Sequence, residues 1–215
     1  MKLGCGLLAM LAALACQPTE PVRDCSGCFY SFADTVLPRT AVVFHWPASR
    51  LPIRVFADPR GAMPSLVSHT IATWQAQFLY GEFQGQLASD SNHADVIVTW
   101  TGGVPANVPP DAGPPVPACA GSTDDPATSL GSSIENALHV VLTSRAGFTD
   151  GQVAACLQRV AVHEMGHALG LLRESDSSSD IMYEDPLVAT PSDRDRHTVE
   201  LLYHTTATII PPPAR

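Results

Sequence analysis

The chain contains almost no lysine: Lys2 is its single lysine, and all its other basic residues are arginines. The lack of lysine beyond position 2 excludes Schiff-base chemistry and the lysine of a phosphate-binding loop. Charged residues make up only 15% and apolar residues 45%, a balance that excludes a disordered protein. The net charge is −9 and no basic stripe is present, so nucleic acid is not expected as a partner.

The N-terminus has the composition of an export signal. Lys2 precedes an uncharged apolar run that ends in small residues and is too short to span a bilayer. Residues 1–15 are therefore predicted to be a signal peptide, and Cys16 follows in a segment similar to a bacterial lipobox. We expect an exported protein anchored to the cell envelope through acylated Cys16; cleavage near Ala15 without a lipid is the alternative.

The rest of the chain is long enough for one domain and shows no internal repeat. We expect a tether at 16–40, a domain at 41–205 and a tail at 206–215, in a monomeric protein. An exported protein favours disulfides among its remaining thiols, which are Cys25, Cys28, Cys119 and Cys156. Three pairings are possible, and our preferred one joins Cys119, in a predicted loop, to Cys156, on a predicted helix.

Hydrophobic periodicity predicts alternating strands and helices. Strands are expected at 51–57, 82–87, 94–100 and 137–143, and helices at 64–80, 149–170 and from 192 onwards. A long stretch at 101–136, rich in proline, glycine, serine and threonine, is predicted to be a loop. Trp46, Trp74 and Trp100 are expected to be core or strand residues.

The helix expected at 149–170 carries the candidate chemistry. Thr149 and Gln152 form a capping-box pattern at its start. His163 and His167 lie one turn apart on the same face, a spacing that lets two imidazoles reach one tetrahedral metal ion. Glu164 projects beside this pair, where it can act as general base towards a metal-activated water.

The run His163-Glu-Met-Gly-His167-Ala-Leu-Gly170 resembles the zinc-binding motif of the metzincins, and Met182 resembles their Met-turn. Ile181-Met182-Tyr183, followed by a short helix, is most similar to the matrixins. The resemblance implies an α+β, zincin-like domain with a mixed, twisted five-stranded sheet, about three helices and a Met-turn near 182. It also implies endopeptidase activity on protein or peptide substrates, a catalytic Zn²⁺, Glu164 as the catalytic residue and Tyr183 in the pocket wall.

The third zinc ligand departs from the family pattern, because Arg173 stands where a third histidine is expected and a guanidinium has no lone pair to offer. Three alternatives stay open: Glu174 is the ligand, Asp176 is the ligand, or no protein group replaces the histidine. The last would make the protein a non-catalytic binding or surface module. Glu200, on the last predicted helix, is a less favoured fourth choice.

Other polar residues carry weaker expectations. A second, structural metal site is not favoured, because the remaining histidines show no compact spacing; they are His45, His69, His93, His139, His197 and His204. Calcium at Asp124-Asp125 or Asp176–Asp180 is a weak expectation, because the second stretch is rich in oxygen ligands but neither has a complete calcium-loop pattern. The sequence thus predicts an exported zinc endopeptidase, with the degenerate module as the competing hypothesis.

Overall fold

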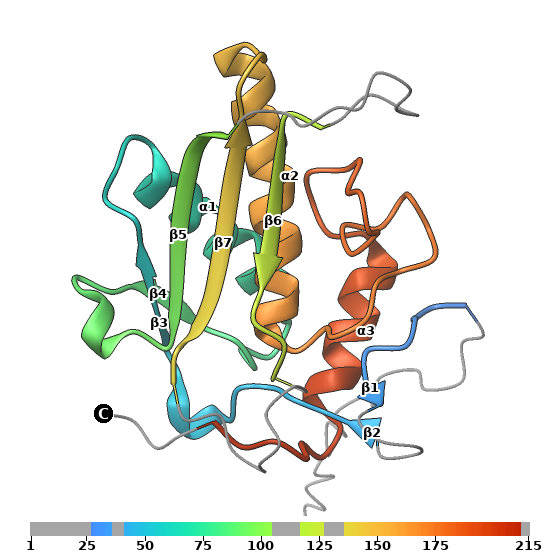
Figure 1. The fold of residues 1–215 in the computed structure, drawn as a ribbon. Helices are drawn as coiled ribbons and strands as arrows, with labels where there is room; N and C mark the ends of the chain where they lie inside the picture. Colours follow the sequence, from blue (N-terminus) through green and yellow to red (C-terminus); the bar gives the residue numbers. More distant parts are fainter. Residues whose placement is uncertain (1–26, 36–40, 105–116, 127–135, 212–215) are drawn as a thin grey trace, which may run out of the picture.

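The structure is a computed structural model that describes residues 27–35, 41–104, 117–126 and 136–211 (Figure 1). It confirms an α+β domain with a five-stranded mixed sheet and three α-helices. The helices are α1 (Met63–Gln75), α2 (Asp150–Leu169) and α3 (Asp193–Tyr203). Two 3₁₀ turns, η1 (Ala48–Arg50) and η2 (Ser91–His93), complete the helical elements of the described residues.

The sheet has the strand order β4-β3-β5-β7-β6. Its strands are β3 (Ile53–Ala57), β4 (Gly85–Leu87), β5 (Val96–Val104), β6 (Cys119–Thr123) and β7 (Leu138–Arg145). The first four strands in that order run parallel, whereas β6 lies antiparallel to β7 at one edge. The antiparallel edge strand is the part of the sheet that borders the candidate site.

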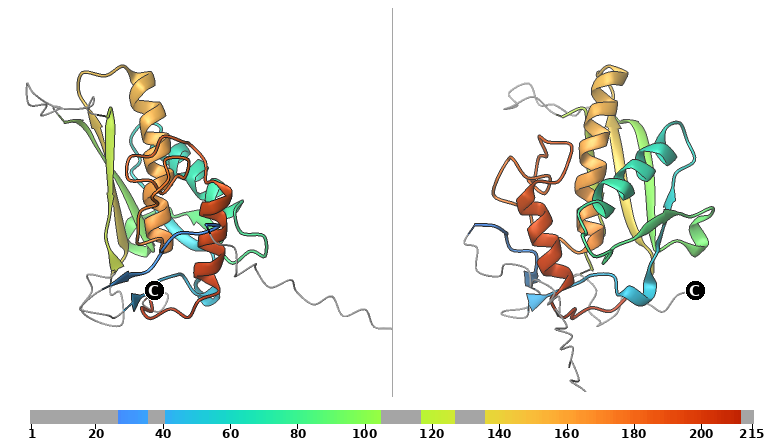
Figure 2. Two further views of the ribbon diagram at one scale, coloured as in Figure 1. Left: turned by 90° about the vertical axis from the view of Figure 1, so that its right-hand side faces the viewer. Right: turned by 180° about the vertical axis from the view of Figure 1, so that it is seen from behind.

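The helices pack on one face of the sheet (Figure 2). Alternate residues of β3 and β7 are buried, as the period of two in their sequences requires. Two buried tryptophans then fix α2 in place, because their indole N–H groups donate to its backbone: Trp74 to the carbonyl of Val162 at 2.7 Å and Trp46 to that of Ala168 at 2.9 Å. Two core side chains therefore hold α2, the helix that carries His163.

Strand β6 lies inside the segment that was predicted to be a loop, so the prediction of a loop throughout 101–136 was wrong. Residues 119–123 pair with β7, and β5 continues to Val104. A five-residue strand containing glycine, serine and threonine has too little apolar alternation to be recognised as a strand from sequence. The expected disulfide between Cys119 and Cys156 is confirmed and joins β6 to α2.

Helix α1 is shorter than predicted, because it ends at Gln75 rather than at position 80. The backbone N–H groups of Gln77 and Phe78 each bond to a carbonyl three residues earlier, which tightens and ends the helix. Phe78 is buried there, against Phe83 and Tyr203. Packing of this one aromatic ring outweighs the local helical pattern.

The described parts of the predicted tether and tail pack onto the domain. Tyr30 is buried, and β1 (Asp34–Thr35) pairs with β2 (Ala41–Val42). At the other end Ile209 is buried and its N–H donates to the carbonyl of Val43. The folded unit therefore extends beyond 41–205 at both ends.

The N-terminal predictions fall on residues that the structure does not describe. These are the signal peptide at 1–15 and the acylated Cys16. Cys28 is described and is disulfide-bonded, whereas Cys25 lies outside the described residues. Within the described ranges, no helix is both long and apolar enough to cross a membrane.

Candidate metal centre

Helix α2 presents both candidate histidines from one buried stretch. The predicted capping box is present, because the Thr149 hydroxyl accepts from the N–H of Gln152 while the Gln152 side chain accepts from the N–H of Thr149. His163 is buried and His167 is 17% exposed at its side chain, so the pair faces the interior with one edge open. The two rings meet edge to face, with centroids 4.8 Å apart.

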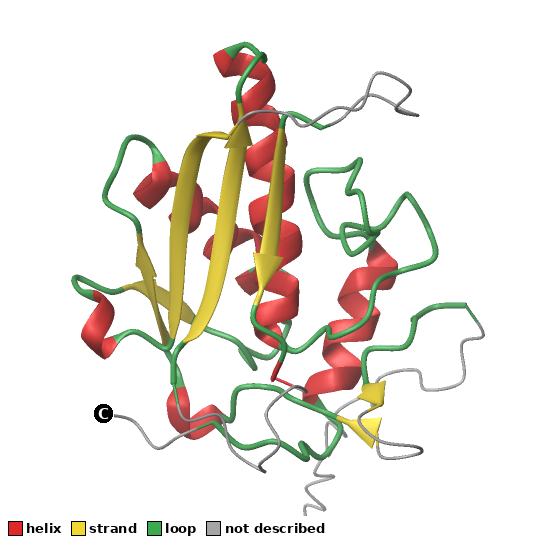
Figure 3. Ribbon diagram, viewed as in Figure 1, coloured by secondary structure: helices red, strands yellow, loops and turns green. Residues whose placement is uncertain are grey.

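Gly170 ends α2 and turns the chain back towards the histidines. Its φ is +112°, in the left-handed region that favours glycine. The N–H of Gly170 donates to the carbonyl of His167 and that of Leu171 to the carbonyl of Gly166, the pairing of a Schellman motif. As predicted, this turn redirects residues 171–174, which lie in the irregular segment between α2 and α3 (Figure 3).

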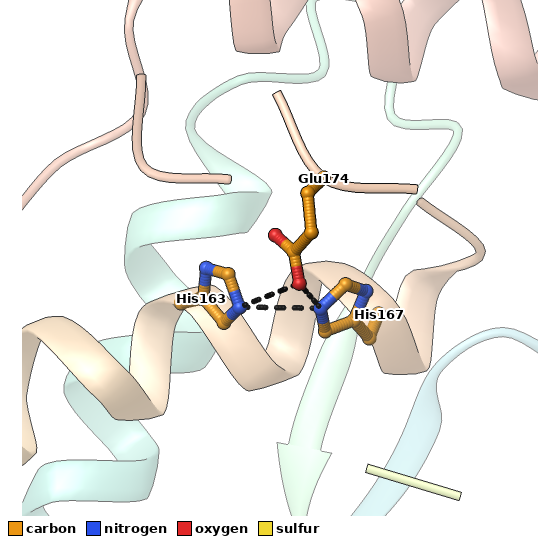
Figure 4. Close-up of side chains that lie close together, drawn as sticks. All are labelled: His163, His167 and Glu174. Carbon is orange, nitrogen blue, oxygen red and sulfur yellow. Dashed lines mark hydrogen bonds and ion pairs between the residues drawn. The ribbon is translucent and has the colours of Figure 1, made fainter. Parts of the chain in front are cut away.

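The turn brings Glu174 to the two imidazoles (Figure 4). Glu174 Oε1 lies 3.2 Å from His167 Nε2 and 3.6 Å from His163 Nε2, and the two Nε2 atoms are 3.2 Å apart. In a tetrahedral zinc site with bonds of about 2.0–2.1 Å, neighbouring ligand atoms lie about 3.3–3.4 Å apart. The spacing of the three atoms therefore fits three corners of such a site.

The tautomers of both histidines suit a metal as well. His163 Nδ1 donates to the carbonyl of Ile181 at 2.8 Å, and His167 Nδ1 donates to the carbonyl of Leu171 at 2.6 Å. A carbonyl oxygen can only accept, so each ring carries a proton on Nδ1, and in the neutral ring the lone pair of Nε2 faces Glu174. Three lone-pair donors that converge in this way are stabilised by a cation between them, and backbone carbonyls that orient the rings are typical of metal sites.

The electrostatics of the group point in the same direction. Burial lowers the pKa of His163, but the hydrogen bond and the charge of Glu174 outweigh it and raise that pKa above its usual value. Burial raises the pKa of Glu174, but its contacts with His163 and His167 lower it to about 2 overall. The group thus favours positive charge at its centre and keeps the Glu174 carboxylate ionised.

Glu164 lies beside this group without belonging to it, as the sequence predicted. Its carboxylate is buried, and Oε2 accepts a hydrogen bond from the hydroxyl of Thr123 at 2.7 Å. Gly121, two residues earlier on β6, leaves the space for the Glu164 side chain, because a Cβ at this position would lie 2.5 Å from it. Thr123 was missed by sequence analysis, since it falls in the stretch that was predicted to be a loop.

The chain around Met182 packs directly behind the histidines. Met182 is fully buried, and its sulfur occupies the space that a Cβ on Gly166 would need. Its neighbour Ile181 supplies the carbonyl that orients His163. Met182 therefore packs against α2 between the two histidines, and Gly166 allows the close approach of the two segments.

A buried carboxylate on α3 holds this turn in place. Asp195 accepts hydrogen bonds from the N–H of Ile181 at 2.8 Å and from the hydroxyl of Tyr30 at 2.8 Å. Burial, first of all, and the nearby Asp195 charge raise the pKa of Tyr30 well above its usual value, so Tyr30 remains a donor. By sequence Asp195 is only an acidic residue near the start of the last predicted helix, and the fold reveals its contact with the turn.

The other ligand candidates lie elsewhere. Asp176 is bound by Arg194 at 2.6 Å, and Arg194 also contacts the buried Asp180 at 3.0 Å. This network occupies the acidic stretch that was considered for calcium. Arg173 points away towards Asp34, with 3.3 Å between Nη1 and Oδ1. Glu200 on α3 is not part of any metal-binding group among the described residues.

Five of the six remaining histidines have separate partners, and His197 lies on α3 outside the metal-binding group. His45 contacts the carbonyl of Thr205, and His69 contacts Gln158. His93 contacts Asp90, His139 contacts Asp124 and His204 contacts Glu82. In the part of the chain that the structure describes, only one group of three His, Cys, Asp or Glu side chains is arranged to hold a metal ion. It consists of His163, His167 and Glu174.

The centre lies in an open cleft between β6 and the segment after α2. The cleft is lined by Gly121, Ser122, Thr123, Asp124, Asp125, Pro126, His163, Glu164, His167, Leu172, Glu174 and Glu184. Tyr183, expected in the pocket wall, is not in this described lining, whereas its neighbour Glu184 is. The proline-rich stretch borders the cleft only through 121–126 in the described residues.

Replacing Glu174 by glutamine should weaken zinc binding, because an amide oxygen is a poorer ligand than a carboxylate. We expect a loss of more than about 100-fold in affinity, since changes behind the ligands already cost 10- to 100-fold. Calorimetric titration with zinc against a competing chelator measures it, with Asp176→Asn as the matched control that keeps wild-type affinity. Loss of binding in Asp176→Asn together with normal binding in Glu174→Gln would assign the ligand to Asp176.

The chain has no match among protein-family models. It has no match among curated proteins either. What this centre binds and does is therefore inferred from its own donor atoms, from their distances and from their surroundings.

Proposed function

We propose that this protein is an exported, zinc-dependent endopeptidase of the metzincin type, similar to the matrixins. The observation that carries the proposal is the convergence of His163 Nε2, His167 Nε2 and Glu174 Oε1 next to the buried carboxylate of Glu164. Three ligands leave one position of a tetrahedral ion open, which is the arrangement of a catalytic zinc site rather than a structural one.

Bound at these three residues, zinc would supply Lewis acidity that polarises a carbonyl and activates water near neutral pH. The chain itself supplies the proton transfers. Glu164 accepts a proton from the attacking water and then donates it to the amine that leaves when the peptide bond breaks. Thr123 holds the Glu164 carboxylate in place through its 2.7 Å hydrogen bond during both steps.

Strand β6 provides the place for an extended substrate. In the described residues it pairs with β7 on one side only, so its outer edge leaves backbone donors and acceptors unpaired. A peptide that adds to this edge as a further strand would be held by main-chain hydrogen bonds, with little dependence on its sequence. Its scissile bond would then pass between β6 and the metal group, within the lined cleft.

Glu174 as third ligand has a consequence for the rate. A carboxylate brings negative charge to the metal, which a third imidazole does not, so it makes the zinc a weaker Lewis acid. We expect slower hydrolysis than in a site with three histidines.

The proposal also includes export of the protein, acylation of Cys16 and a monomeric state.

Removal of the metal tests this function most directly. The purified full-length protein should cleave a casein-type substrate, lose that activity with a zinc chelator and regain it on addition of about one equivalent of Zn²⁺. Cleavage that persists after the protein-bound zinc is shown to be gone would contradict the mechanism. A protein that binds zinc but cleaves no substrate would instead support the non-catalytic module.

A further inference from the structure

The cleft has walls of one charge. Five of its lining residues are carboxylates: Asp124, Asp125, Glu164, Glu174 and Glu184. No lysine or arginine is present in the lining that the structure describes. The metal donors and Glu164 define the centre independently of this charge, and the other three acids set the electrostatic character of the approach to it.

The acids of the walls come from two segments that are far apart in the sequence. Asp124 directly follows β6; its carboxylate accepts from the backbone and ring N–H groups of His139, yet its side chain remains 55% exposed. Glu184 follows the Met182 turn on the opposite wall and is exposed. A substrate between the two walls therefore meets negative charge on both sides.

Two arginines near the centre, Arg173 and Arg194, contact acids outside the cleft lining. Arg173 is next to Glu174 in the chain, but its guanidinium contacts Asp34. Arg194 is held between Asp176 and Asp180, which lie outside the cleft. A divalent cation at the centre offsets the charges of Glu164 and Glu174, and the carboxylates of Asp124 and Glu184 still line the approach to it.

We propose that the preferred substrates are cationic polypeptides, in which arginine or lysine residues flank the bond to be cleaved. The inference rests on the proposed peptidase function and names the substrate class for that site. A cleft lined by one sign of charge concentrates substrates of the opposite sign and speeds their binding. Acidic substrates are disfavoured, because each would place its carboxylates against like charges.

Three peptides of equal length test the preference. Each has the same residues at the scissile bond and differs only in its flanking positions, which are arginine, serine or glutamate. For the zinc-loaded full-length protein at low salt, we expect kcat/KM to be about tenfold or more higher for the arginine peptide than for the glutamate peptide. The ratio should fall at about 0.5 M NaCl, because salt screens charges in an open cleft.

Variants that each remove one charge from the cleft lining test whether that charge causes the preference for the arginine peptide. Glu184→Gln and Asp124→Asn should each reduce the arginine-to-glutamate ratio by about two- to fivefold, the range for one partly exposed charge pair. Asp185→Asn is the matched control, because it removes the same charge one residue from Glu184 but outside the cleft lining. An equal reduction in Asp185→Asn, or no preference in the wild-type protein, overturns the proposal.

Binding separates failure of this inference from failure of the proposed function. Fluorescence anisotropy of the labelled peptides on zinc-loaded Glu164→Gln protein reports charge preference without turnover. Cleavage of all three peptides at equal rates would leave the peptidase function standing and reject the substrate class. Tight binding of the arginine peptide with no cleavage by the wild-type protein would reject the function and keep the charge preference.

Discussion

Glu164→Gln is expected to reduce peptide hydrolysis by about 10²- to 10⁴-fold, the usual contribution of a general acid–base residue. Glutamine has the shape of glutamate and its carbonyl oxygen can still accept the hydrogen bond from Thr123. It cannot take a proton from water, however, so kcat should fall while the fold is kept. The three metal donors are untouched, and zinc content per chain should therefore remain at the wild-type value.

The control for this variant is Glu200→Gln. Glu200 lies on α3, outside the metal group, and its replacement should leave both zinc content and kcat unchanged. Peptide cleavage and zinc stoichiometry measured on the same samples distinguish the two roles. Wild-type kcat in Glu164→Gln would reject Glu164 as the base. Loss of zinc in Glu200→Gln would indicate that Glu200 is the third zinc ligand.

Gly170→Ala is expected to give the largest loss of stability, about 2–6 kcal/mol, from two separate causes. The backbone at φ +112° is strained for any residue with a Cβ, and that Cβ would overlap the backbone carbonyl oxygen of Phe44. Neither atom can move alone, because Phe44 is a fully buried core residue. Denaturant unfolding measures the change in the free energy of unfolding.

Gly147→Ala separates the two causes. Gly147 also has a positive φ, of +94°, but a Cβ there would meet nothing within 4 Å. It should cost only the backbone strain, about 1–3 kcal/mol. Equal losses in both variants would show that the contact with Phe44 contributes nothing. Where Gly170→Ala still folds, its zinc affinity should fall as well, because Gly170 sets the turn that leads to Glu174.

The helix that carries the chemistry could be predicted in detail because its signals are local. The capping box at Thr149, the shared face of His163 and His167, and the left-handed turn at Gly170 each depend on residues within one or two turns of helix. All three are present in the structure. The coarse fold followed in the same way from the order of the apolar patterns, and its five-stranded mixed sheet is confirmed.

The residues that complete the centre could not be predicted with the same precision. Thr123 belongs to a short edge strand whose pairing with β7 depends on residues far away in the chain. Asp195 is by sequence an acid in the first turn of a helix, and its bond to the Met182 turn requires that turn to lie against α3. Tyr30 was assigned to a tether, although its hydroxyl reaches the same carboxylate.

Lysine scarcity, the paired histidines and the adjacent glutamate can all be read from the sequence alone, which excludes lysine-dependent chemistry and predicts a centre of histidine and carboxylate groups. The choice between Glu174 and Asp176 is of another kind. The two acids lie two residues apart on an irregular segment, and the sequence left both open as ligands. Arg194, on a distant helix, holds Asp176, while the turn at Gly170 directs Glu174 to the imidazoles. Long-range charge pairing and backbone direction place Glu174, rather than Asp176, at the imidazoles. Neither effect can be read from the spacing of neighbouring residues.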